Sequence, residues 1–185
     1  MLLMKWSSVN EVKHETELGI VFQINVKPET PGERGIPKHA TPKVHVTANG
    51  LAGDFNRWRH EKAQDDPAMA ILILPLETIE ELNREGWAIK PGDLGENFTT
   101  QGIPYNSFAP GKLYRVGDAE IQITKPCAPC NFLFSLPNMG ENETIVKTLH
   151  NRRGWYARTE MQGWVVKGDT ISELPTSQNK NHSPS

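Results

Sequence analysis

The hydrophobic pattern of the chain consists mostly of short segments with the alternation of β-strands. Apolar side chains occupy every second position of residues 18–26, which predicts a half-buried strand. Residues 43–48 alternate in the same way, and the Asn49-Gly50 pair behind them is a strong turn signal. Residues 69–74 form a continuous apolar run, which is typical of a strand buried on both faces. These segments favour a β-rich fold.

Two other segments carry helical spacing instead. Apolar residues recur at helical intervals between Leu76 and Leu82, and Pro75 before them suits the first turn of a helix. Residues 143–153 carry a second apolar stripe, and Gly154 behind it predicts where that helix ends. Further short strands are predicted over residues 113–116, 120–124, 155–158 and 164–167.

The composition agrees with a mostly β (α+β) fold. The chain has 185 residues, the size of one domain, and its 15 Gly and 14 Pro predict more turns than a helical bundle would need. We therefore predict a single barrel-like domain over residues 1–174. Residues 175–185 contain no hydrophobic side chain and are predicted to be a disordered tail. Residues 54–67 are polar and predict a long loop, of the kind that often lines a functional site.

The charge balance and the absence of long apolar runs restrict the partners and the location. Twenty Lys and Arg against 22 Asp and Glu give a net charge of -2, which argues against a large basic footprint for nucleic acid but is compatible with a local basic patch. The longest apolar run, residues 68–76, is interrupted by Pro75 and is too short to span a bilayer. No signal peptide is visible before Lys5. We therefore expect a cytoplasmic protein with neither a nucleic-acid nor a membrane partner.

The strongest chemical motif is the segment Thr-Lys-Pro-Cys-Ala-Pro-Cys that ends at Cys130. It follows a predicted strand directly, and its two prolines stiffen it and hold it out of regular pairing. A thiolate presented there can bind a soft metal, attack an electrophile or carry sulfur as a persulfide. Lys125 favours the charged form of a nearby thiol. The alternatives are that Cys127 and Cys130 form a redox disulfide, or that both are small buried hydrophobic side chains.

A structural zinc site is not expected from these cysteines. Such a site normally uses four ligands, and the Cys-x-x-Cys pair supplies two. The six histidines are scattered singly along the chain, so the pattern does not provide the missing pair.

A glycine-rich stretch, residues 92–102, is a second candidate for binding. Its glycines let the backbone approach a ligand, and exposed N–H groups there could form an anion site. Asn97 lies in the middle of it, and we expect this residue on a bent segment rather than within a helix. The alternative is a plain turn, in which Asn97 bonds only to its own backbone.

A third candidate is the glycine turn at residues 49–54, which is followed by basic residues. Arg57 and Arg59 beside such a turn could hold a phosphate group. A hairpin turn with a solvated loop explains the same residues without a ligand.

Taken together, these segments resemble the MOSC family, which is named for the C-terminal part of molybdenum cofactor sulfurases. The resemblance covers nearly the whole chain and rests on the order of its pieces, residues 35–38, 50–54, 92–100, 126–130 and 154–158. The most specific part is Gly-Asp-Leu-Gly-Glu-Asn followed by Pro-x-x-Pro-Cys. The fold that this resemblance implies is a closed β-barrel with short decorating helices, related to the pyruvate kinase barrel domain.

The resemblance also implies roles for individual residues. Cys130 matches the key family cysteine and would be the protein ligand to molybdenum, whereas Cys127 would be secondary. Asn97 would position the pterin, and Lys38 would lie near the cofactor phosphate. Phe55 stands where many members have Arg, so another basic residue would have to compensate. The further candidate cofactor-binding residues are Arg57, Thr124, Lys125 and Arg158.

Three functions are compatible with this resemblance. The first is reduction of N-hydroxylated compounds at the molybdenum cofactor. The chain has no Rossmann glycine motif and no four-cysteine iron–sulfur set, so a separate flavin or iron–sulfur protein would supply the electrons. The second is a sulfur carrier, with a persulfide on Cys130 supplied by a partner cysteine desulfurase. Pyridoxal phosphate is not expected, because the chain is too short to include the desulfurase domain of the large family members. The third is cofactor binding without catalysis.

Overall fold

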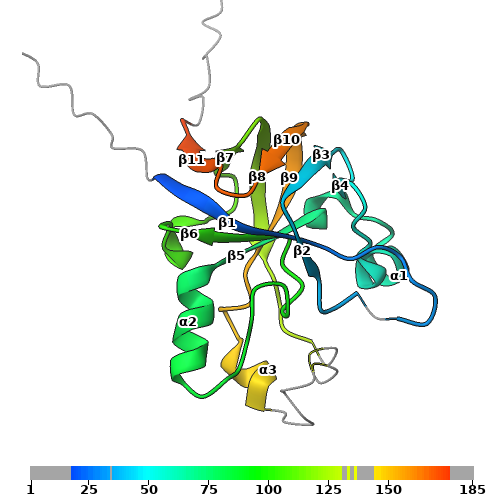
Figure 1. Cartoon of the computed structure of the whole chain (residues 1–185), viewed down its shortest axis with the longest axis vertical. Helices are drawn as coiled ribbons and strands as arrows, with labels where there is room; N and C mark the ends of the chain where they lie inside the picture. The colour runs from blue at the N-terminus through cyan, green and yellow to red at the C-terminus, as the bar shows by residue number, and fades with distance from the viewer. Residues whose placement is uncertain (1–17, 34, 131–132, 134–135, 137–143, 176–185) are drawn as a thin grey trace, which may run out of the picture.

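The central feature of the computed structural model is a closed barrel, and the structure describes residues 18–33, 35–130, 133, 136 and 144–175 (Figure 1). Among these residues, seven strands pair in the order β11-β7-β8-β9-β5-β6-β1, and β1 pairs back with β11. The strands are β1 (Leu18–Val26), β5 (Ile71–Pro75), β6 (Phe98–Gln101), β7 (Leu113–Val116), β8 (Ala119–Pro126), β9 (Trp155–Met161) and β11 (Thr170–Leu174). Only the β5–β6 pairing in this ring is parallel. The predicted mostly β fold with a closed barrel is confirmed.

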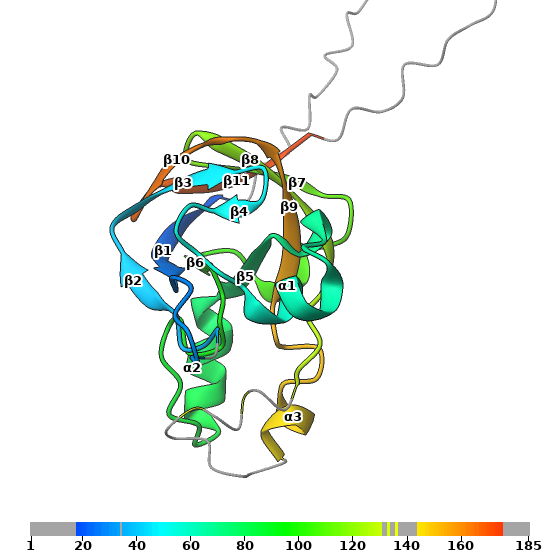
Figure 2. The ribbon, with the colours of Figure 1, turned by 90° about the vertical axis from the view of Figure 1, so that its right-hand side faces the viewer.

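Shorter strands extend the barrel and add a small second sheet. The short strand β2 (His39–Thr41) pairs with the end of β1, and β10 (Gly163–Val166), β3 (Lys43–Thr47) and β4 (Gly50–Leu51) form a separate sheet. Its apolar side chains, Val44, Val46, Leu51 and Val165, belong to the barrel core. In both ribbon views this sheet lies at the opposite end of the molecule from α2 (Leu76–Arg84) and α3 (Thr144–Thr148) (Figure 2).

Two apolar clusters stabilise the fold. The larger one fills the barrel and includes fully buried side chains from all seven ring strands. The smaller one joins β5 to the helices, because Ile79 and Leu82 of α2 pack in one cluster with Ile145 of α3. The predicted helix after Pro75 and the predicted doubly buried strand before it are both present, and every residue of β5 is buried.

The face of β1 differs from the prediction at its N-terminal end. Strict alternation would bury Ile20 together with Ile24, yet Ile20 is 41% exposed, whereas Val21 and Ile24 are fully buried. The register of β1 against β6 shifts between Val21 and Gln23. This bulge reverses the side-chain direction within one strand, because one extra residue exchanges the two faces.

The predicted loop over residues 54–67 is wrong, because this segment contains the helix α1 (Arg57–Ala63) and begins the 3-10 turn η1 (Pro67–Met69). The Asn56 side chain caps α1 by accepting from the Arg59 N–H, and Asp66 caps η1 in the same way. No residue of α1 is buried. A helix without a buried face shows no apolar periodicity, which is why the pattern missed it.

The second predicted helix is shorter than expected. Residues 143–153 were expected to be helical, but α3 ends at Thr148, and a turn with Asn151 at a positive φ of 59° follows. The remaining short element of the described chain is the 3-10 turn η2 (Tyr105–Ser107).

Two further expectations concern the C-terminal tail and a membrane-spanning segment. The predicted tail at residues 175–185 falls, apart from Pro175, outside the described residues. Within the described part of the chain, no helix is long and apolar enough to cross a membrane.

Candidate functional site

A cavity of about 480 Å³ brings together several of the residues that the sequence singled out. Six regions line it: the loop before β2, the start of α1, the η1–β5 segment, Gly95 of the glycine-rich stretch before β6, the end of β8 with the Cys-x-x-Cys segment and Leu133, and the start of β9 with the residue Arg153 before it. The lining residues that carry chemistry are Lys38, Arg57, Trp58, Lys125, Cys127, Cys130, Arg153 and Tyr156. A cavity of this size suits a small-molecule ligand.

Both cysteines are free thiols that line this cavity. Cys127 is buried, and its backbone N–H donates to the Gly154 carbonyl at 2.9 Å, which anchors the segment to the start of β9. Cys130 is half-buried and follows Pro129 outside regular structure. Cys130 is therefore the more accessible of the two sulfurs. Among the described residues, no three His, Cys, Asp or Glu side chains gather into a metal site.

Tyr156 of β9 lies beside these cysteines in the cavity wall. Burial raises the pKa of its hydroxyl above the usual range, and the neighbouring Cys127 raises it further. The hydroxyl therefore stays protonated at all physiological pH values and can donate a hydrogen bond into the cavity.

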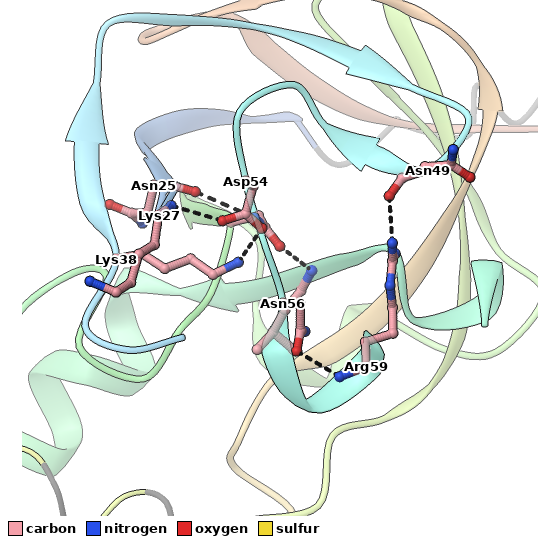
Figure 3. Close-up of polar contacts among 9 residues, drawn as sticks. Asn25, Lys27, Lys38, Asn49, Asp54, Asn56 and Arg59 are labelled. Carbon is pink, nitrogen blue, oxygen red and sulfur yellow. Dashed lines mark hydrogen bonds and ion pairs between the residues drawn. The ribbon is translucent and has the colours of Figure 1, made fainter. Parts of the chain in front are cut away.

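A buried ion pair supports one side of the cavity (Figure 3). The Lys38 ammonium lies 2.6 Å from an Asp54 carboxylate oxygen, and the two side chains are 2% and 5% exposed. Asp54 also accepts from the Lys27 backbone N–H at 2.9 Å and from the Asn97 amide at 2.9 Å. Burial lowers the pKa of Lys38, while the charge of Asp54 opposes that shift. Lys38 is thus held at the cavity by a neutralising partner behind it.

Asn97 is bonded within the fold and is absent from the described cavity lining. Its amide oxygen accepts from the Leu72 N–H at 3.0 Å, and its amide nitrogen donates to Asp54 and, at 3.3 Å, to the Asn25 carbonyl. It lies on a bent segment just before β6, as expected. The side chain joins β1, β5 and the Asp54 turn, which favours a structural role over contact with a pterin.

The other predicted cofactor-binding residues divide into two groups. Arg57 and Lys125 line the cavity with Lys38. Arg158 is not in the lining; it pairs with Glu160 at the surface. The Thr124 hydroxyl is likewise outside the lining and bonds to the carbonyls of Ala68 and Tyr156.

Arg59 does not line the cavity, although it belongs to the same helix as Arg57. It donates to the Asn49 carbonyl at 2.9 Å, so it fastens α1 to the glycine turn (Figure 3). Phe55, which stands at the usual family arginine position, contacts the His60 ring at 5.5 Å.

The structure adds a cation that the sequence reasoning missed, Arg153. It lines the cavity and is 6% exposed, yet its Nε and Nη1 atoms have no hydrogen-bond partner among the described residues. The sequence placed Arg153 at the end of a helix, whereas it lies in the turn before Gly154, whose φ is 104°. The Asn-Arg-Arg-Gly sequence was the available turn signal.

A buried carboxyl group lies close to this cation. Glu96 is fully buried; its Oε1 accepts from the Gly92 N–H at 2.6 Å and from Thr99 at 2.9 Å, but Oε2 has no partner among the described residues. Burial raises the pKa of Glu96, and the charge of Arg153 acts in the opposite direction. Glu96 is not part of the cavity lining, so Arg153 presents its charge to the cavity without a paired carboxylate in the described lining.

The arrangement suits an anionic ligand with a soft centre. Four cations line the cavity, and no acidic side chain is among the described lining residues. Lys38, Arg57 and Lys125 each pair with a carboxylate outside the lining, whereas Arg153 forms no ion pair among the described residues. A buried guanidinium without a partner is costly unless a ligand satisfies it. Cys130 adds a thiol, the donor type preferred by soft metals.

Comparison with known proteins identifies relatives of the whole barrel. The family model of the MOSC domain matches residues 56–172. The YuaD protein from Bacillus subtilis superposes with a TM-score of 0.71 at 18% identity, covering 86% of this chain and 97% of that one. YiiM from Escherichia coli superposes with a TM-score of 0.60 at 20% identity, covering 89% of this chain and 71% of that one. YiiM from Geobacillus stearothermophilus superposes with a TM-score of 0.60 at 25% identity, covering 85% of this chain and 75% of that one.

A curated relative from yeast also aligns. It is altered inheritance of mitochondria protein 39, mitochondrial, from Lachancea thermotolerans, 27% identical over 139 residues. The alignment covers 72% of this chain and 41% of that protein, so the chain spans about two fifths of the relative's length. The relative's name refers to mitochondria, and the cytoplasmic location of this chain stays a prediction.

Proposed function

The chain belongs to the MOSC domain family, and from this premise we propose that its cavity binds the molybdenum cofactor, with the Cys130 thiolate as the protein ligand to the metal. The observation that carries the proposal is the unpartnered Arg153 guanidinium in the same cavity as Cys130. A pterin phosphate would satisfy that guanidinium, and a dithiolene-held metal would meet the thiolate.

Different lining residues would supply positive charge and hydrogen-bond donors to the cofactor. Lys38 and Arg153 are nearly buried and would hold the anionic end of the cofactor, while Arg57 and Lys125 add positive charge nearer the solvent. The Tyr156 hydroxyl, held protonated by burial, would donate a hydrogen bond to a sulfur or an oxygen in the cavity.

We propose that the reaction is removal of the oxygen atom from an N-hydroxylated compound. When bound, the metal centre would supply the two-electron reduction. The overall change converts N–OH to N–H and releases water, consuming two electrons and two protons. The electrons would come from a separate flavin or iron–sulfur protein, because the chain holds only two cysteines. Pyridoxal phosphate has no part in this proposal.

The proposal is tested by expression of the chain in a host that makes molybdopterin, followed by metal and pterin analysis of the purified protein. Acetamidoxime is then supplied under anaerobic conditions with reduced methyl viologen, a one-electron dye, in place of the unknown partner. We expect one molybdenum atom per chain. We also expect two molecules of the one-electron dye to be oxidised for each amidine molecule that is formed. Protein that lacks molybdenum and pterin in this host would refute the proposal.

A sulfur carrier is the second candidate function. The half-buried, free Cys130 thiol favours it, since an accessible thiol can hold a persulfide sulfur. Mass spectrometry after incubation with a cysteine desulfurase and cysteine would then show a gain of one sulfur atom that a reducing agent removes. A stable mass would exclude this function.

We expect Arg153→Met to separate cofactor binding from stability. The cofactor-free variant will be more stable by about 1 kcal/mol, because Met replaces a buried cation that lacks hydrogen-bond partners. Its pterin and molybdenum content will nevertheless fall. Denaturant unfolding and cofactor analysis measure the two effects. Arg57→Met is the control, since Arg57 is 28% exposed and already donates to the Glu33 carbonyl; it will lose less cofactor. A less stable Arg153→Met protein with full cofactor would contradict this assignment.

A further inference from the structure

Trp58 has a position that the proposed cofactor site does not explain. It belongs to α1, is 38% exposed and lines the cavity, yet it is part of neither apolar core cluster. A large aromatic side chain contributes most to stability when it is buried. Trp58 leaves much of its surface facing the cavity and the solvent, so its place on α1 is not accounted for by packing of the fold.

The helix that carries Trp58 is held in place by other residues. The Asn56 side chain caps its N-terminus, Arg57 donates to the carbonyls of Glu33 and Thr30, and Arg59 donates to the carbonyl of Asn49. None of these contacts uses the indole ring. Trp58 is therefore presented on a fixed support, which lowers the entropic cost of binding a ligand against it.

Trp58 lies in the exposed part of the cavity wall, whereas Lys38 and Arg153 lie in its buried part. Lys38 and Arg153, which suit the anionic cofactor, are 5% and 6% exposed. Among the large hydrophobic side chains of the described lining, Trp58 is exposed, whereas Met69 and Leu72 are buried. A cofactor held by the buried cations would leave the exposed part of the wall, which carries Trp58 together with Arg57 and Lys125, for a molecule that enters and departs.

We propose that Trp58 is a specificity-determining residue whose indole ring binds a flat apolar group of the substrate. This inference rests on the proposed function and names its substrate class as N-hydroxylated compounds that carry an aromatic or similar flat apolar group. Arg153, the lining cation that forms no ion pair among the described residues, disfavours substrates with a further positive charge. Stacking on the indole supplies the attraction.

The test compares two ligands that share the reacting group, benzamidoxime with a phenyl ring and acetamidoxime with a methyl group. Each is titrated by calorimetry into the cofactor-loaded protein without reductant, so that binding is measured in the absence of turnover. We expect wild-type protein to prefer benzamidoxime by about tenfold, and Trp58→Ala to lose that preference. Trp58→Phe will keep part of it. Trp164→Ala is the matched control, since Trp164 is 48% exposed but lies outside the cavity lining on β10; it will keep the full preference.

Kinetics with reduced methyl viologen provide the second measurement. Trp58→Ala will raise the KM for benzamidoxime about tenfold, and kcat and the KM for acetamidoxime will stay near their wild-type values. The proposal is overturned if wild-type protein shows no preference, if Trp58→Ala keeps it, or if Trp58→Ala loses pterin and molybdenum, which would assign the ring to the cofactor. Failure of the proposed function gives a different result: no reduction of either amidoxime by wild-type protein, whatever the binding preference.

Discussion

Replacement of Cys130 by Ala will abolish molybdenum binding, while Cys127→Ala will keep most of it. Cys130 is the more accessible cysteine of the cavity, whereas Cys127 is 4% exposed. The change to Ala removes the soft donor that the metal requires. No carboxylate can take the place of the thiolate, since none is in the described lining. Metal analysis of the two variants, expressed side by side in a molybdopterin-producing host, measures the difference.

Thermal unfolding of both cysteine variants provides the control for this result. Cys127→Ala removes a buried side chain and will lower the melting temperature more than Cys130→Ala does. If Cys127→Ala loses more stability and Cys130→Ala loses more molybdenum, Cys127 is the packing residue and Cys130 the metal ligand. Equal loss of molybdenum in both variants would instead indicate that the two sulfurs act as a pair.

Asp54→Ala will be strongly destabilising, by about 3–5 kcal/mol in the free energy of unfolding. The change leaves the buried Lys38 ammonium without its counter-charge, and it removes the acceptor of the Lys27 N–H and of the Asn97 amide. Urea unfolding followed by circular dichroism measures the loss. We also expect weaker cofactor retention, because Lys38 loses the partner that positions it.

Glu33→Ala is the matched control for that experiment. The Lys27–Glu33 pair has the same 2.6 Å separation as the Lys38–Asp54 pair, but the Glu33 side chain is 54% exposed. Solvent screens an exposed pair, so its loss will cost much less than the loss of the buried Lys38–Asp54 pair. Similar losses in the two variants would show that burial does not set the strength of the Lys38–Asp54 pair.

The strands could be predicted from the sequence because strands and their turns leave a local signal, whereas the closure of the barrel was implied by the family resemblance. Alternation and the apolar run located β3, β5, β7 and β9 to within a few residues. The inward face of β1 could not be predicted, since the bulge between Val21 and Gln23 depends on its pairing with β6, far along the chain. The helix α1 left no periodic signal because polar caps and surface contacts, rather than a buried face, hold it.

The candidate site was predictable where its residues lie next to a strand end. The Cys-x-x-Cys segment follows β8 directly, so its exposure at the strand end could be anticipated. Arg153 could not be assigned, because the helix before it ends one turn earlier than the apolar stripe suggests. For Asn97 the sequence motif is prominent, but it does not reveal the partners of the side chain. The structure shows that its amide oxygen accepts from Leu72 and that its amide nitrogen donates to Asp54 and Asn25.

The strand that completes the barrel, β11, is the last of the seven ring strands along the chain and therefore the last of them to be synthesised. Ile20 of β1 pairs with Thr170 of β11, across about 150 positions of sequence, and such distant contacts slow folding. Until β11 is made, β1 and β7 each present an open edge that can pair with another nascent chain. We therefore expect the yield of correctly folded protein to fall as synthesis is accelerated, and chains truncated before Thr170 to aggregate.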